Sequence, residues 1–210
     1  MIRRPAKRTG RRALLPSWRQ GVAAAAVASA LLVANDVFLY ESVVVPSASM
    51  WPTVLPNERA FLHHLSGPIK RFDVVVIKSP RFGERLAKRV VGLPGERVRL
   101  EDSWRVLIND VSLGYIAETG STVRREGDDH EICVAPGRGV TFPTRVGAAD
   151  VLLGPDEYFL LGDNRLASDD SRTFGPVSAA DIQGTLGTVW YSFDVGQRRL
   201  RTERLLRAIR

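Results

Sequence analysis

A serine and a lysine in this sequence lie in local contexts that suit them to break a peptide bond together. Ser49 lies between Pro46 and Pro52, and the two prolines favour an extended or turn geometry that presents the hydroxyl. A serine hydroxyl is a poor nucleophile at neutral pH and requires a base beside it. The Ser49 backbone N–H and the Ser47 hydroxyl are candidate donors to the oxyanion that forms when a carbonyl is attacked.

Lysine is the candidate base, because none of the three histidines of the chain lies in a credible position. A lysine acts as a base only when it is neutral, which requires its pKa to fall by several units from about 10.4. Lys88 is flanked by Leu86-Ala87 and Val90-Val91, and burial of such an apolar run penalises the ammonium form. Of the four lysines, Lys88 is therefore the predicted base.

The residues that bind metals in proteins are scarce or wrongly spaced here. Cys133 is the only cysteine, which excludes an intramolecular disulfide, and we interpret it as a small buried hydrophobe. No histidine has a second ligand at the spacing that zinc sites show. Asp163, Asp169 and Asp170 lack the spacing and the final glutamate of a calcium-binding loop. We therefore expect no metal and no cofactor.

The elements that must position Ser49 and Lys88 are predicted to be strands. The body, residues 41–195, is expected to be one mainly β catalytic domain, with an irregular insertion at about 112–150 that holds a strand or two. Asn109-Asp110 is typical of a hairpin turn. The expected strands, rich in β-branched residues and bounded by turn signals, are 72–78, 86–91, 98–100, 106–108, 111–113, 158–161 and 184–193.

The N-terminal region predicts a membrane anchor. Residues 21–40 are apolar apart from Asn35 and Asp36, and twenty helical residues match a hydrocarbon core of about 30 Å. Residues 1–20 carry seven basic side chains and no acid, which predicts a cytoplasmic N-terminus and a single transmembrane helix. A cleavable signal peptide cut near Ala28–Ala30 is the alternative. Both interpretations place the body outside the cytoplasm.

The C-terminal segment, residues 196–210, is a basic tail. Its apolar residues are spaced so that they fit one face of an amphipathic helix at the membrane surface, and a frayed basic terminus is the alternative. The net charge of +7 is concentrated at the two ends of the chain, which favours contact with anionic lipid over nucleic acid. The apolar residues concerned are Leu200, Leu205, Leu206 and Ile209.

Three segments in this order resemble bacterial type I signal peptidase, also called leader peptidase: 46–53 (PSASMWPT), 88–95 (KRVVGLPG) and 162–172 (GDNRLASDDSR). The resemblance implies a membrane-bound serine endopeptidase with a signal-peptidase-like β-sheet or barrel domain. It would lie in the inner (plasma) membrane with the catalytic domain on the outer face, and would cleave N-terminal signal peptides from exported preproteins. Its partners would be those preproteins and the lipid bilayer.

The resemblance also implies a role for individual residues. Ser49 is the nucleophile and Lys88 the general base of a Ser-Lys dyad, and Ser47 completes the oxyanion hole with the Ser49 amide. Ser168 orients the lysine amine, and Asp170 pairs with Arg172 to support the site. A carboxylate touching the lysine would raise its pKa and weaken the base, so the pairing of this aspartate with an arginine is the arrangement we expect.

The resemblance further implies shallow apolar pockets lined by Val45 and Ala87, which accept small side chains at the cut site and at the third residue before it. Leu166-Ala167 stands where many relatives are more polar. A specialised processing peptidase of conjugative pili or of an organelle inner membrane is an alternative, as is an inactive β domain that only binds signal peptides. A self-cleaving Ser-Lys regulator would need a DNA-binding domain ahead of Ser49, where an apolar segment lies instead.

Overall fold

The chain divides into two units, Met1–Phe38 and Leu39–Arg210. The predicted cytoplasmic segment 1–20 and anchor 21–40 lie almost wholly outside the described residues, and Tyr40 is the first residue of a strand rather than the last of a helix. No helix within the described ranges has the length and apolar character needed to cross a bilayer. The computed structural model describes residues 18, 21–22, 25–27, 40–64, 67–80, 83–101, 105–117, 123–126, 130–134 and 150–209.

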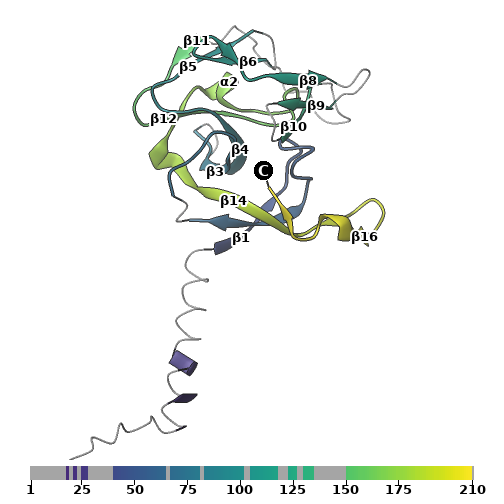
Figure 1. Cartoon of the computed structure of the whole chain (residues 1–210). Coiled ribbons are helices and arrows are strands. Elements are labelled where there is room, and N and C mark those ends of the chain that lie inside the picture. Colours follow the sequence, from purple (N-terminus) through teal and green to yellow (C-terminus); the bar gives the residue numbers. More distant parts are fainter. Residues whose placement is uncertain are drawn as a thin grey trace, which may run out of the picture. The chain divides into compact units, whose positions relative to one another are not determined.

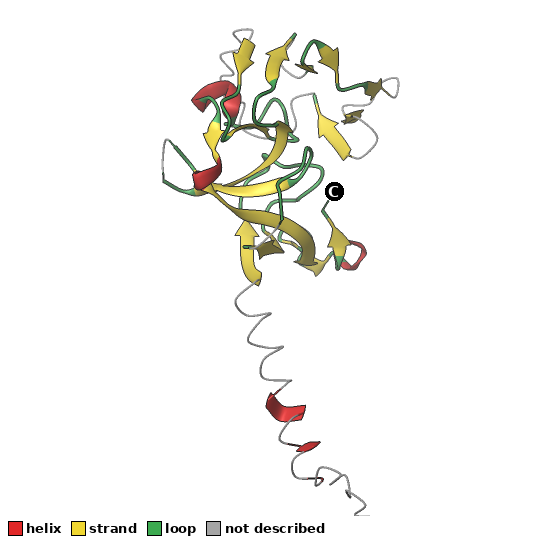
Figure 2. Ribbon diagram, turned by 60° about the vertical axis from the view of Figure 1, so that its left-hand side comes forward, coloured by secondary structure: helices red, strands yellow, loops and turns green. Residues whose placement is uncertain are grey.

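The second unit is mainly β, as expected, and Figure 2 shows its few helical turns as short pieces between strands. Its largest sheet runs in the order β1-β2-β14-β3-β4-β12-β13, with β17 paired to β14 (Figure 1). All of its pairings are antiparallel. The strands are β1 (Tyr40–Val45), β2 (Glu58–His63), β3 (Val74–Lys78), β4 (Arg85–Gly92), β12 (Glu157–Leu161), β13 (Val177–Ser178), β14 (Ile182–Tyr191) and β17 (Arg207–Ala208).

Strand β3 lies at the centre of this sheet because its side chains are apolar on both faces apart from the last, and β4 pairs beside it. Successive side chains of a strand point to opposite faces. Val74 and Val76 pack with Val43 and Val45 of β1 in one apolar cluster. The alternate residues of β3 pack in a second cluster together with apolar residues of β4, β12 and β13. The central position of β4 thus buries Lys88, which is 1% exposed.

A smaller sheet has the order β11-β5-β6-β7, and the Asn109-Asp110 turn joins β6 to β7. Both turn residues have left-handed backbone angles, with φ of 50° and 68°, as hairpins of this kind require. Its strands are β5 (Arg97–Leu100), β6 (Val106–Ile108), β7 (Val111–Ser112) and β11 (Asp150–Leu152).

The predicted insertion at 112–150 contains more regular structure than expected. Its described part forms a three-stranded sheet, β10-β9-β8, in addition to the end of β7. Figure 1 shows this sheet and the β11-β5-β6-β7 sheet at the end of the domain opposite β1. The three strands are β8 (Tyr115–Ala117), β9 (Val123–Glu126) and β10 (His130–Cys133).

The prediction of a helical face in the C-terminal tail is wrong. Residues 193–209 form a hairpin of β15 (Phe193–Asp194) and β16 (Arg199–Leu200), a 3-10 turn η2 (Thr202–Arg204) and strand β17. Pairing of β17 with β14 satisfies backbone groups that a helix would satisfy internally, and Ile209 packs against the cluster of β1. The segment therefore belongs to the β domain, which does not end at residue 195.

Candidate active site

Ser49 lies in the connection between β1 and β2, which is folded into two consecutive turns. Trp51 N donates to Ala48 O at 3.1 Å, and Val54 N donates to Met50 O at 2.9 Å. The Met50 and Val54 side chains are fully buried and anchor the connection in the core. Ser49 directly precedes Met50 in the chain and is itself only 6% exposed, so packing in the core fixes the position of its hydroxyl.

Lys88 extends from β4 to the hydroxyl of Ser49. Its Nζ donates to Ser49 Oγ at 2.9 Å and to Ala87 O at 3.0 Å. Burial lowers the pKa of Lys88 from 10.5 to about 8, against the opposing charges of Asp170 and Asp169. At pH 7 roughly one amine in ten is therefore neutral, far more than for a free lysine, and a general base must be neutral.

Ser47 lies beside the two predicted catalytic residues. Its Oγ is 3.0 Å from Ser49 Oγ, and the two hydroxyls share a hydrogen bond. Ser47 is more exposed than Ser49 and borders the cavity described below. A hydroxyl at this distance is within reach of an oxygen bonded to the carbon that Ser49 attacks.

Ser168, predicted to orient the lysine amine, is buried next to the site but makes no hydrogen bond to Lys88 within the described residues. It packs instead against Gly162, where a Cβ would lie 2.1 Å from Ser168 Oγ and 2.6 Å from Ser49 O. Only glycine allows the chain to pass this closely. Gly162 is therefore a site residue that the sequence analysis did not identify.

Asp170 and Arg172 form the expected ion pair. Arg172 Nε and Nη2 donate to the two carboxylate oxygens of Asp170, each at 2.7 Å. Asp170 also accepts from Gly162 N at 2.9 Å and caps the short helix α2 (Ser171–Phe174). Burial by itself would raise the pKa of Asp170, but Arg172 and the Gly162 N–H hold it below its usual value. Asp170 therefore remains ionised.

A second buried ion pair lies next to the lysine, and the sequence analysis did not identify it. Arg89 Nε and Nη2 donate to the carboxylate of Asp163 at 2.7 and 2.6 Å, and both side chains are fully buried. Thr53 Oγ1 donates to the same carboxylate at 2.5 Å. Arg89 is followed directly by Val90 and Val91, and a charged residue in such an apolar run was a signal for a buried partner.

Asn164 links the third segment to the connection that carries Ser49. Its backbone N donates to Ser49 O at 3.0 Å, and its side-chain Nδ2 donates to Ala48 O at 3.1 Å. The two bonds hold the backbone carbonyl groups on both sides of Ser49. Together with the Asp163 pair, they tie segment 162–164 to β4 and to the serine.

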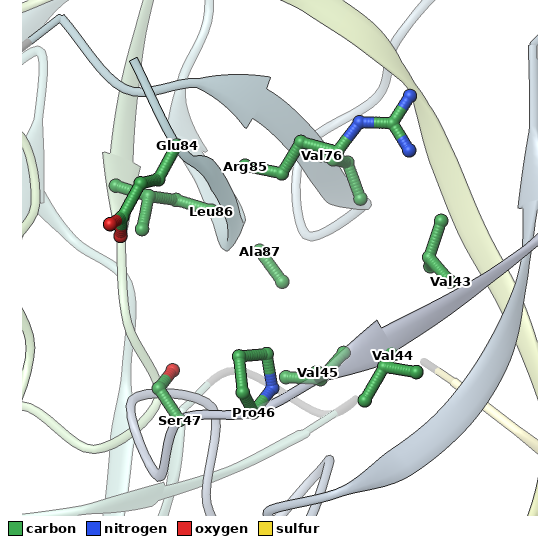
Figure 3. Close-up of a pocket in the computed structure, with 10 residues that line it drawn as sticks. All are labelled: Val43, Val44, Val45, Pro46, Ser47, Val76, Glu84, Arg85, Leu86 and Ala87. Carbon is green, nitrogen blue, oxygen red and sulfur yellow. The ribbon is translucent and has the colours of Figure 1, made fainter. Parts of the chain in front are cut away.

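A cavity of about 120 Å³ opens beside Ser47, between the end of β1 and the beginning of β4 (Figure 3). Val45 and Ala87, the two residues of the predicted substrate pocket, both line it, on opposite sides. Valine and alanine side chains leave a shallow apolar space next to Ser47.

In the described part of the chain, no group of three or more His, Cys, Asp or Glu side chains could hold a metal ion.

A serine hydroxyl next to a dehydrated lysine amine, in a β domain with a small apolar cavity, is the arrangement of a serine hydrolase of the Ser-Lys type. The family model described as "Signal peptidase, peptidase S26" matches residues 18–191, and the chain belongs to this family. The membership predicted from the three sequence segments, in the bacterial type I signal peptidases, is thereby confirmed. Its activity is that of a serine endopeptidase that cleaves signal peptides from secreted preproteins.

Several bacterial signal peptidases are similar over most of their length. Signal peptidase I of Bacillus licheniformis is 32% identical over 194 residues, covering 90% of this chain and 95% of the relative. Signal peptidase I P of Bacillus subtilis subsp. natto is 31% identical over 173 residues, covering 80% and 84%. The crystal structure of a signal peptidase I from Enterococcus faecalis V583 is 32% identical, with a TM-score of 0.39, covering 58% of this chain and 99% of that one.

Proposed function

We propose that signal peptides are cleaved here by a Ser-Lys dyad in which Ser49 is the nucleophile and Lys88 the general base. The observation that carries the proposal is the 2.9 Å contact between Lys88 Nζ and Ser49 Oγ in a site where the amine is buried. No histidine is needed, because dehydration supplies the neutral amine that a free lysine lacks at neutral pH.

The first step forms an acyl-enzyme. Neutral Lys88 takes the proton of the Ser49 hydroxyl, and Oγ attacks the carbonyl carbon of the residue before the cut. The carbonyl oxygen becomes an oxyanion, which accepts hydrogen bonds from the Ser49 N–H and the Ser47 O–H. When the tetrahedral intermediate collapses, the C–N bond breaks and the lysine ammonium gives its proton to the amine of the mature protein, which leaves.

The second step releases the signal peptide. Lys88, neutral again, takes a proton from a water molecule, whose oxygen attacks the ester carbonyl. The C–Oγ bond breaks, Ser49 regains a proton from the lysine, and the signal peptide leaves with a new carboxyl end. Ser168 lies next to these groups, and its buried hydroxyl has no hydrogen-bond partner among the described residues. This hydroxyl is therefore proposed to orient the Lys88 amine when substrate is bound.

The ion pairs have a supporting role in this proposal. Asp170 is neutralised by Arg172, and Asp163 by Arg89, so neither carboxylate forms a direct ion pair with the lysine. A direct contact would favour the ammonium form and weaken the base. The cavity lined by Val45 and Ala87 is proposed to accept the small side chains next to the cut.

We also propose that the apolar segment from residue 21 up to the start of β1 anchors the enzyme in the plasma membrane as a single span, with the N-terminus in the cytoplasm. The seven basic residues in 1–20 and the apolar run that follows support this orientation. Ser49 follows Tyr40, the first residue of β1, by nine residues, so the length of chain limits how far Ser49 can lie from the outer membrane surface.

Cleavage of a preprotein by the full-length chain in detergent tests the dyad. Ser49→Ala and Lys88→Ala are expected to abolish cleavage, while Lys78→Ala is the matched control, because Lys78 is an exposed lysine on the neighbouring strand β3. Cleavage by either dyad variant at the wild-type rate would exclude the proposed chemistry. Binding of the preprotein without any cleavage by the wild type would identify a domain that only binds signal peptides.

A further inference from the structure

An exposed ion pair joins the two strands that flank the cavity. Arg85, the first residue of β4, donates from Nη1 and Nη2 to the carboxylate of Glu41 on β1, at 2.5 and 3.2 Å. The same carboxylate is 3.2 Å from His64 Nε2. The Arg85 and Glu41 side chains are 47% and 38% exposed, so a peptide entering from solvent can reach both.

The strand segments beside the cavity have free edges. β1 pairs with β2, and β4 pairs with β3 from Arg85 to Arg89, whereas β12 joins β4 from Arg89 onward. Within the described ranges, β1 and the first half of β4 each have one edge without a pairing strand. The cavity lies between these two segments, with Val43 to Ser47 on one side and Glu84 to Ala87 on the other (Figure 3). Free edges of this kind bind an extended peptide through its backbone.

The position of the ion pair along such a peptide follows from strand geometry. Both strands advance toward the dyad, β1 toward Ser49 and β4 toward Lys88. Arg85 precedes Lys88 by three residues of β4, or about 10 Å at 3.3 Å per residue. Consider a peptide whose scissile carbonyl lies at Ser49 and which extends back along β4. About the fourth residue before the cut then lies at Arg85.

We propose that the Glu41–Arg85 pair makes the enzyme tolerant of either charge at the residue about four positions before the cut, because each member of the pair neutralises the other. This inference rests on the proposed function, since it requires the peptide to lie in the cavity with its carbonyl at Ser49. In the intact pair, each charge is compensated by its partner, so a peptide charge of either sign gains little. Loss of one partner leaves the other charge facing the peptide.

Three peptides test the proposal, identical except for Ala, Asp or Lys at the fourth residue before the cut. Arg85→Gln exposes Glu41, and is expected to raise the ratio of kcat/KM for the Lys peptide over the Asp peptide by about three- to tenfold, the range for a partly exposed charge pair. Glu41→Gln should lower the same ratio by a similar factor. The exchange Glu41→Arg with Arg85→Glu should return the ratio to within about twofold of the wild-type value.

The matched control is Arg97→Gln. Arg97 forms an ion pair of similar exposure with Asp150, at 2.6 Å and with 50% and 41% exposed side chains, but in the β11-β5-β6-β7 sheet. Its removal should leave the ratio unchanged. If the variants cut the Ala peptide but all show the wild-type ratio, the inference is overturned and the proposed function stands. If the wild type cuts none of the three peptides, the proposed function is overturned, and this inference with it.

Discussion

The buried Arg89–Asp163 pair makes the sharpest stability prediction, because it combines complete burial with short contacts. Both side chains are 0% exposed, and the pair is joined by two hydrogen bonds of 2.7 and 2.6 Å. Arg89→Met removes the guanidinium and leaves the Asp163 carboxylate with the Thr53 hydroxyl as its partner. Breaking a buried pair in this way costs about 3–5 kcal/mol, mostly because one charge remains in a site without water.

The assay is urea denaturation of the domain, and two further variants isolate the cause. The double change Arg89→Met with Asp163→Leu removes both charges, and should recover most of the loss, since an apolar pair of similar volume is often as stable as the ion pair. Arg97→Met removes an arginine from the exposed pair with Asp150 and should cost no more than about 1 kcal/mol. A loss below about 1 kcal/mol for Arg89→Met would refute the view that this pair is dehydrated.

Three other predictions concern the active site and its support. First, kcat/KM should rise about tenfold between pH 7 and pH 9 and then level off, because a base with a pKa of about 8 in the free enzyme goes from roughly one tenth to nine tenths neutral over that range; a pH–rate profile checks this, and a curve still rising at pH 10 contradicts it. Second, Gly162→Ala should reduce kcat at least tenfold, because its Cβ would lie 2.1 Å from Ser168 Oγ; single-turnover cleavage measures this, and wild-type kcat would contradict it. Third, Arg204→Met should lower the free energy of unfolding by about 3–5 kcal/mol, because it leaves Glu58 buried without its cation; a denaturation curve matching the wild type would contradict this.

The parts of the fold that the sequence predicts well are those in which neighbouring residues determine the structure. Runs of β-branched residues predicted β3 and β4, and the Asn109-Asp110 dipeptide predicted the turn between β6 and β7. Ser49 and Lys88 were likewise selected as candidates from their own short segments, and the structure places Lys88 Nζ 2.9 Å from Ser49 Oγ. In each case the signal lies within a few residues, so no knowledge of distant contacts is required.

The features that escaped prediction depend on contacts between distant segments. Arg204 is 146 residues from Glu58, and no local pattern indicates that the two meet. The leucine spacing of the C-terminal segment matches a helical period, but pairing with β14 and burial of Arg204 decide its conformation instead. The close passage of Gly162 past Ser49 is equally invisible in either segment alone.

The central claim is that a dehydrated lysine amine removes the proton of the serine hydroxyl, and the protonation of Lys88 tests it most directly. The chain has only four lysines, so NMR titration of ¹³C-labelled lysine side chains can resolve each of them. Lys88 should change its chemical shift with a midpoint near pH 8, while its signal in Lys88→Arg is absent. A Lys88 midpoint above about 10, the value of a free lysine, would contradict the account.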